Sequence, residues 1–344
     1  MPPVSIIITA HEQCDVLRRH LPAILEQDYP SEYEVIVVDM NSSDGTLSML
    51  EAMQMRNPHL HVIKMPDSSR DVSLERLALT LGIRSASNEW LVLTHADCIP
   101  ASAHWLRHMV STCEAKPGTQ IVVGQSRFVG GHGWHGLRCR FFRARQQWIH
   151  LHHARRYGAY RCDGTNLCYR RSLFFEHRGF AEHANLQAGA TDIMVNHHST
   201  ALNTAVCMHP QAIILQDTPR NPHWWSRERV FFMETRHHFR RTLRYRFTYF
   251  LCASLVWLCT LLLTAVFVAS LVLHNYVAAG LSLGAWWVYM VYICFSFNRY
   301  LKSIGEPTII LALPLLLHLV LCWDTAAWLR WLFTDKNVFK KRFI

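Results

Sequence analysis

Three uncharged runs beyond residue 246 constrain the fold of this 344-residue chain most strongly. No Asp, Glu, Lys or Arg occurs in residues 247–273, 276–297 and 307–323. A helix rises 1.5 Å per residue, so roughly 20 apolar residues cross the ~30 Å hydrocarbon core of a bilayer. Residues 250–272 and 277–297 each have this length. We therefore expect a transmembrane helical hairpin within residues 249–297, which excludes a disordered chain and a small disulfide scaffold.

The third run is shorter and Pro314 interrupts it, so within residues 298–344 we expect a re-entrant or interfacial segment and a basic tail, with a third full span as the alternative. Cationic residues flank the hairpin on both sides: Arg236, Arg240, Arg241, Arg244, Arg246, Arg299 and Lys302. Such flanks stay in the cytoplasm by the positive-inside rule. The opening residues have no basic region, and their apolar run is too short for a signal peptide. We expect residues 1–235 in the cytoplasm, followed by a basic juxtamembrane segment, 236–248.

The net charge of +10 indicates an anionic partner, which is phosphate, an acidic lipid surface or nucleic acid. Residues 115–162 contain nine Lys and Arg and no Asp or Glu. We interpret this stretch as a surface for phosphate or lipid headgroups, with a solvated basic face as the alternative. No nucleic-acid-binding module is recognisable beside the membrane segments, so we expect no nucleic-acid partner.

Cysteine and histidine patterns do not indicate a metal cluster. The eleven cysteines form no CxxC pair, which favours reduced thiols over a zinc knuckle or a disulfide framework. Four histidine pairs stand close in the sequence: His132/His135, His152/His153, His197/His198 and His237/His238. These pairs come without the Cys or carboxylate partners of a metal cluster, so the sequence argues against a metal site built from histidines.

Strand and helix patterns alternate over the first 100 residues. Buried-strand runs occupy residues 4–10, 34–40, 61–65 and 89–97. Helical patterns lie between them at residues 14–27, 46–56 and 74–86. This alternation predicts an α/β fold with a parallel sheet whose ligands bind at the carboxyl ends of the strands. Neither GxGxxG nor GxxxxGKS occurs, which disfavours a dinucleotide oxidoreductase and a P-loop NTPase.

Four separated segments carry a family resemblance. They read, in chain order, VSIIITAHEQ, EVIVVDMNSSDGT, EWLVLTHADCIPASAHWL and DGTNLCYRRSLFFEHRGF. In this order and spacing they resemble the family 2 glycosyltransferases, most of all the membrane-attached bacterial members with a hydrophobic tail. The resemblance covers residues 3–235 and implies a GT-A fold, which is a mostly parallel sheet with helices on both faces.

The resemblance implies a nucleotide-sugar site at the strand ends. Asp39 matches the acid near the nucleoside base or ribose, and Glu12 is a further candidate for base contact. Asp97 matches the second acid of the DXD motif, which binds Mg²⁺ or Mn²⁺ bridging the donor diphosphate; a cap of the following turn is the alternative. Arg76 falls where relatives carry a basic residue beside the nucleotide, and an exposed helical arginine is its alternative.

The motifs depart from the family pattern at three places, of which His95 and Thr191 are the first two. His95 stands for the first acid of DXD, and imidazole suits transition metals better than it suits Mg²⁺. The segment GATDIMVN, residues 189–196, resembles the acidic catalytic segment, in which Asp192 matches the general base and Thr191 replaces the preceding acid. An inverting transfer needs a base about 3 Å from the acceptor hydroxyl. The alternative for Asp192 is an N-cap of a helix beginning near Ile193.

A third segment, residues 221–232, occupies the place of an aromatic and basic motif near the diphosphate and acceptor. Its candidates are Trp224 and Trp225 for stacking on a sugar, and Arg227 and Arg229 for phosphate oxygens. Phe231 and Phe232 stand where a further Arg or His is expected.

Two functions follow from this pattern. The first is an inner-membrane bacterial enzyme, with its catalytic domain in the cytoplasm, that transfers a sugar from a UDP-linked donor to a lipid-linked or polysaccharide acceptor of the cell envelope. The alternative is a catalytically weakened or inactive relative that assists another transferase at the membrane. The three departures, at His95, Thr191 and Phe231–Phe232, keep the alternative open.

Overall fold

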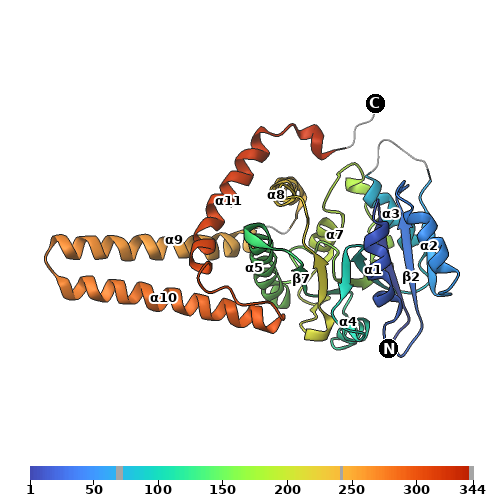
Figure 1. The fold of residues 1–344 in the computed structure, drawn as a ribbon, viewed down its shortest axis with the longest axis horizontal. Helices are drawn as coiled ribbons and strands as arrows, with labels where there is room; N and C mark the ends of the chain where they lie inside the picture. The colour runs from blue at the N-terminus through green and yellow to red at the C-terminus, as the bar shows by residue number, and fades with distance from the viewer. Residues whose placement is uncertain (67–72, 241–242, 341–344) are drawn as a thin grey trace. The chain divides into compact units, whose positions relative to one another are not determined.

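The structure is a computed structural model that describes residues 1–66, 73–240 and 243–340 (Figure 1). The chain divides into two compact units. The first consists of Met1–Arg241 together with Phe333–Ile344, and the second is Thr242–Leu332. Arg241 of the basic flank and Lys341 and Arg342 of the basic tail lie outside the described residues.

A mixed sheet forms the centre of the first unit. In the described residues its order is β3-β2-β1-β4-β8-β6-β9. The bounds are β1 (Val4–Ala10), β2 (Tyr33–Asp39), β3 (Leu60–Lys64), β4 (Trp90–His95), β6 (Ile121–Val123), β8 (Leu167–Arg170) and β9 (Thr204–Val206). Strands β1 to β4 run parallel, and only β8 runs antiparallel to its neighbours among these described strands. A smaller sheet pairs β10 (Ile214–Asp217) with β5 (Cys98–Pro100) and β7 (Ser126–Val129).

Helices cover both faces of the main sheet. They are α1 (Cys14–Leu25), α2 (Thr46–Gln54), α3 (Leu74–Ser85), α4 (Trp105–Glu114), α5 (Gly133–Tyr157), α6 (Arg171–Glu176) and α7 (Ala190–His198), while α8 (Trp224–Thr235) contacts α5. Alternate residues of a strand face opposite sides, so Ile6 and Ile8 contribute to one core and Ile7 to the other. Leu17 of α1 and Trp105 of α4 pack in the first core.

The second core includes residues of α3, α5 and α7, which carry candidate site residues. Ile7 packs there with Ile83 of α3, Leu151 of α5 and Val195 of α7. The predicted α/β fold, mostly parallel with helices on both faces, is confirmed, as are the four strands and three helices expected in the first 100 residues. Because β1 pairs with β2 and β4 in register, the carboxyl ends that carry Asp39 and His95 lie on either side of β1.

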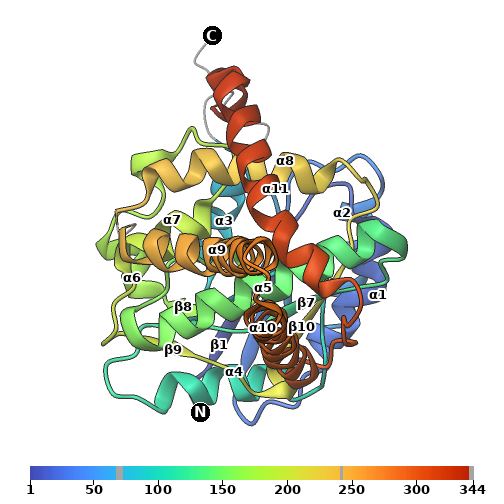
Figure 2. The same cartoon turned by 90° about the vertical axis from the view of Figure 1, so that its left-hand side faces the viewer.

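The second unit contains three apolar helices. These are α9 (Leu243–Val272), α10 (Tyr276–Ser303) and α11 (Leu313–Phe333). By length and composition, Tyr249–Val272, Tyr276–Ser303 and Leu313–Phe333 are each able to cross a membrane. Helices α9 and α10 form a hairpin and lie side by side in both views (Figure 1, Figure 2).

Polar contacts connect α11 to the hairpin within this unit. The Tyr249 hydroxyl donates to Asp324 at 3.1 Å, and Trp257 Nε1 donates to the carbonyl of His318 at 2.8 Å. The third run is divided next to Pro314, because residues 307–312 are not helical and α11 begins at Leu313. Pro314 is the second residue of α11, and a proline in the first turn removes no intrahelical hydrogen bond.

Candidate active site

Asp39 ends β2 and is fully buried. Its Oδ2 accepts a hydrogen bond from the N–H of Ser42 at 3.2 Å. Its Oδ1 is buried and has no hydrogen-bond partner among the described residues. Buried polar atoms almost always have a partner, so this oxygen is suited to a donor from outside the chain. A ribose hydroxyl or a base N–H, as the sequence predicts, has the right chemistry.

Glu12 lies in the loop after β1 and reaches the loop after β2. Its Oε1 accepts from the backbone N–H of Ser43 at 2.6 Å and from the Ser43 hydroxyl at 2.9 Å. Glu12 has a φ of 52°, in the left-handed region that is uncommon for residues other than glycine. The carboxylate therefore joins the two loops that border Asp39, and its predicted contact with the base remains a prediction.

His95, Asp97 and Cys98 form a candidate cation site at the end of β4. One ligand atom from each lies within 4.8 Å of the others. Burial raises the pKa of the Cys98 thiol well above its ordinary value, and Asp97 raises it further. Imidazole and carboxylate are thus the two ready donors, and this mixed pair fits Mn²⁺ better than the oxygen-preferring Mg²⁺.

A chain of polar contacts leads away from Asp97. Its Oδ2 accepts from Nε2 of Gln216 at 3.1 Å, and Oε1 of Gln216 accepts from Nη2 of Arg143 at 2.7 Å. Arg143 also pairs with Asp163 through Nη1. Burial would raise the pKa of Asp163, but Arg143 and Arg161 lower it well below its ordinary range. The network thus runs from the candidate metal site to an ionised, half-buried carboxylate.

The sequence motifs assign no role to Gln216 or Asp163. The available signal was Asp163 itself, the first acid after the basic stretch 115–162. Residues 115–162 do not form the single exposed surface that their charge predicts. Arg143 and Arg161 turn inward to carboxylates, and Arg145 is only 4% exposed.

Asp192 lies in the first turn of α7 and is 4% exposed. Arg161 binds it bidentately, with Nη2 at 2.7 Å from Oδ2 and Nε at 3.0 Å from Oδ1. Burial raises the pKa of Asp192, and Arg161 opposes that rise. The N-cap alternative is wrong, because Gly189 occupies the N-cap and the helix begins at Ala190. Glu228 of α8 is near enough to interact electrostatically with both Arg161 and Asp192.

Gly164 brings the end of β4 and the start of α7 together. A Cβ added there would lie 3.4 Å from Nε2 of His95 and 3.2 Å from Oγ1 of Thr191. Its φ of +85° is one that glycine adopts without strain. His95 and Thr191, the two positions where an acid is expected, therefore approach the same glycine.

Arg76 is placed differently from the expectation. The exposed alternative is wrong, since Arg76 is 2% exposed. Its Nε donates to the carbonyl of Leu186 at 2.9 Å, and its Nη2 donates to the carbonyl of Ala188 at 2.8 Å. Burial lowers its pKa to about 10, which Glu75 opposes, so the guanidinium is charged at neutral pH. Arg76 supports the loop that leads into α7, and contact with a nucleotide remains a prediction.

The four candidates on α8 divide into two kinds. Trp225 and Arg229 are buried, and the guanidinium of Arg229 lies 4.9 Å from the Trp225 ring. Arg138 of α5 lies 4.4 Å from the same ring, so Trp225 helps to pack α8 against α5. Trp224 is half-buried, with its ring 5.8 Å from Phe128, and Arg227 is exposed.

The phenylalanines of α8 have packing partners. The ring of Phe232 lies 4.1 Å from the guanidinium of Arg161, the partner of Asp192. Phe231 lies 5.2 Å from Phe339, ring to ring. Phe232, which stands where an Arg or His is expected, therefore contacts the arginine that holds Asp192, the candidate base.

Comparison with known proteins identifies the family of this chain. The family model for glycosyl transferase family 2 matches residues 5–177. Glycosyltransferase AglE of Haloferax volcanii is 30% identical over 134 residues, which is 39% of this chain and 42% of AglE. The probable glycosyltransferase YdaM of Bacillus subtilis is 25% identical over 239 residues, which is 67% of this chain and 54% of YdaM. The chain thus spans about half the length of these relatives.

A solved structure shows the same fold. The mannosyltransferase PcManGT from Pyrobaculum calidifontis, in complex with GDP-Man and Mn²⁺, aligns with a TM-score of 0.58 and 18% identity, covering 96% of this chain and 87% of PcManGT. At this identity the similarity concerns the fold alone. Because the family model covers more than half of its residues, the chain belongs to glycosyltransferase family 2, with a GT-A fold.

Proposed function

We propose that this chain transfers a sugar from a nucleotide-sugar donor to a lipid-linked or polysaccharide acceptor at a membrane. The observation that carries the proposal is the polar network from Asp97 to Asp163, with Arg161 pairing the neighbouring Asp192. It connects a candidate metal site with a candidate base, which are the two groups that this transfer needs. Family membership supports the reaction type.

Donor binding uses the strand ends. The unpartnered Oδ1 of Asp39 accepts a hydrogen from the nucleoside, and Glu12 holds the two neighbouring loops together. His95 and Asp97 hold a divalent cation, Mn²⁺ in preference to Mg²⁺, which neutralises the departing diphosphate. PcManGT, which holds GDP-Man and Mn²⁺, supports the donor class and the cation. We take the nucleotide to be UDP-linked, as expected from the sequence resemblance.

Asp192 is the general base of an inverting transfer. The acceptor hydroxyl oxygen attacks the anomeric carbon as the bond from that carbon to the diphosphate breaks, and the hydroxyl proton passes to Asp192. The diphosphate leaves with the electron pair of the broken bond. Arg161 orients the carboxylate, and burial brings the pKa of Asp192 closer to neutrality than that of an exposed acid. Both effects suit a base that works at neutral pH.

Membrane attachment is through the second unit, with α9 and α10 crossing the bilayer. Residues Lys336–Phe339 belong to the first unit, where the N–H of Gln187 donates to the carbonyl of Phe339 at 3.0 Å and the Phe339 ring is 2% exposed. Both flanks of the apolar helices then lie on one side of the membrane, which requires an even number of crossings. This favours α11 at the interface, and the positive-inside rule favours the first unit in the cytoplasm of a bacterial inner membrane.

One observation favours the second candidate, a weakened or inactive relative that assists another transferase. Arg161 engages both oxygens of Asp192, so the base is held in an ion pair. Together with Thr191 and His95 in place of acids, this pair would lower the rate of proton transfer.

Release of nucleoside diphosphate by the purified protein in detergent distinguishes the two candidates. The donors are a panel of sugar nucleotides, the cations are Mg²⁺ and Mn²⁺, and polyprenyl phosphates serve as acceptors. We expect acceptor-dependent release with one donor, more with Mn²⁺ than with Mg²⁺, and a loss of release in Asp192→Asn. Nucleotide binding without release from any donor would instead favour the assisting partner.

A further inference from the structure

We propose that Glu182, His183 and His197 form a binding site for a transition-metal ion such as Zn²⁺, separate from the cation site at Asp97. One ring nitrogen of each histidine and one carboxylate oxygen of Glu182 lie within 4.8 Å of one another. Two imidazoles and one carboxylate are a common zinc donor set, with water in the fourth position. Ligands about 2.1 Å from a tetrahedral ion are roughly 3.4 Å apart, so the separations of up to 4.8 Å need to shorten by at most about 1.4 Å.

Hydrogen bonds around the cluster leave one possible metal-binding atom on His197 and one on Glu182. Nε2 of His197 lies 2.8 Å from the backbone carbonyl of His238. A carbonyl only accepts, so Nε2 carries the hydrogen and Nδ1 keeps its lone pair. Metal-binding histidines are typically oriented by this kind of contact on the other ring nitrogen. Oε2 of Glu182 likewise accepts from Nη2 of Arg240 at 2.9 Å, which leaves Oε1 for an ion.

His183 supplies the second independent observation. Its Nε2 is buried and has no hydrogen-bond partner among the described residues. A buried ring nitrogen without a partner is rare, and a bound metal is one explanation for it. The nitrogen belongs to a ring that is 5.8 Å from the ring of His197 and 5.0 Å from that of His238.

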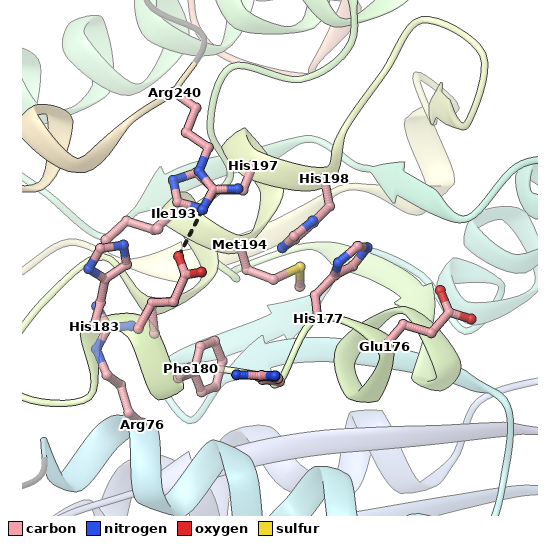
Figure 3. Close-up of a pocket in the computed structure, with 14 residues that line it drawn as sticks. Arg76, Glu176, His177, Phe180, His183, Ile193, Met194, His197, His198 and Arg240 are labelled. Carbon is pink, nitrogen blue, oxygen red and sulfur yellow. Dashed lines mark hydrogen bonds and ion pairs between the residues drawn. The ribbon is translucent and has the colours of Figure 1, made fainter.

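The site occupies one side of a cavity of about 230 Å³. His183, His197 and Arg240 line that side, while His177 and His198 stack on each other at the opposite side (Figure 3). The stacked rings are 3.8 Å apart, so these two histidines face one another. They provide matched controls in the same cavity that lie outside the proposed donor set.

An ion here would act on the helix of the candidate base. His197 lies in the last turn of α7 and Asp192 in its first turn. Glu182 and His183 belong to the short 3-10 helix Ala181–His183, which precedes the loop held by Arg76. The ion would therefore fix the end of α7 to the segment before it. The sequence argued against such a site because the carboxylate partner of His197 is fifteen positions away in the chain.

Metal content of the full-length protein in detergent tests the proposal, with no need for sugar transfer. After removal of metal by a chelator, the protein is dialysed against Zn²⁺ and its bound zinc is measured; Co²⁺ is added in parallel for its tetrahedral absorption bands. We expect the wild type to hold one more equivalent of Zn²⁺ than His183→Ala, His197→Ala and Glu182→Gln, and these variants to lose the Co²⁺ bands. Glu182 is exposed, so Glu182→Gln keeps the test valid if a histidine variant does not fold.

Two controls separate this site from other histidines. His177→Ala removes a ring of the same cavity, and His95→Ala removes the donor at the sugar site; both should keep the additional equivalent of Zn²⁺ and the Co²⁺ bands. Equal zinc in the wild type and the three cluster variants would overturn the proposal. Loss of zinc in His95→Ala alone would also overturn it, because the ion would then belong to the site at Asp97.

Discussion

Arg161 holds both carboxylate oxygens of Asp192, with Nη2 at 2.7 Å from Oδ2 and Nε at 3.0 Å from Oδ1. The two residues are 31 positions apart in the chain and both side chains are nearly buried. Phe232 of α8 lies against the guanidinium of Arg161. A buried pair of this kind orients the carboxylate, but it leaves a costly unpaired charge when one partner is removed.

Asp97→Ala and Asp192→Asn should fail at different steps. In the proposed function Asp97 holds the cation of the bound donor, so its loss should abolish most metal-dependent nucleotide binding. Asp192 is the proposed base for the acceptor proton, so Asp192→Asn should bind nucleotide normally and lose transfer by about 10²- to 10⁴-fold. Calorimetric titration with UDP and Mn²⁺, followed by a transfer assay, measures both effects. Equal loss of binding in the two variants would mean that Asp192 is structural.

Arg161→Gln should lower stability and move the pH profile. The substitution leaves Asp192 buried without its cation, which costs about 3–5 kcal/mol. Because Arg161 opposes the rise in the pKa of Asp192, its removal should shift the acidic limb of the transfer rate to higher pH. Thermal unfolding and a rate–pH profile measure the two effects. An unchanged acidic limb would exclude Asp192 as the titrating base.

Asp163→Asn should remove part of the acid sensitivity of the first unit. The pKa of Asp163 is lowered in the folded protein, so its stabilising contribution is present above the ordinary Asp pKa of about 3.9 and is lost as the pH falls through the folded value. The variant should be less stable at neutral pH and lose less stability on acidification below about pH 4. Denaturation at a series of pH values measures this, and parallel curves for variant and wild type would contradict it.

His95→Asp should change the metal preference. A second carboxylate beside Asp97 suits Mg²⁺, whereas imidazole suits transition metals. The side chain lies at a strand end and is half-buried, so the fold should persist. Donor affinity measured with each cation should shift from Mn²⁺ toward Mg²⁺. If neither the wild type nor a variant with Asp at both 95 and 191 turns over any donor, the assisting-partner function is favoured.

The side of the membrane reached by residue 338 tests the number of crossings. Val338 is 48% exposed and lies next to Phe339 in the segment that packs on the first unit. With two crossings, Val338→Cys in intact cells should stay unlabelled by a thiol reagent that does not cross the bilayer. Tyr276→Cys, at the start of α10 next to the turn after α9, should be labelled. Labelling of the protein without either substitution measures the contribution of the native cysteines. Labelling at 338 would show that α11 spans.

The sequence by itself determined the first four strands, the first three helices and the two apolar helices of the hairpin. Each of these depends on local periodicity, and a buried parallel strand or a 20-residue apolar run is visible in a short window. The position of Asp39 at a strand end is equally local. The order of the motifs that resemble the family then identified Asp97 and Asp192 as candidate site residues. It did not indicate which side chains contact them.

Only the tertiary structure decided which distant side chains meet. Arg161 with Asp192, Arg143 with Asp163 and Glu182 with His197 all join segments whose contact depends on how helices and loops pack against the sheet. Charge counting assigned Arg143 and Arg161 to a surface, because a sequence does not record which face of a helix or loop becomes buried. Packing turned both side chains inward, where a buried cation requires a carboxylate partner.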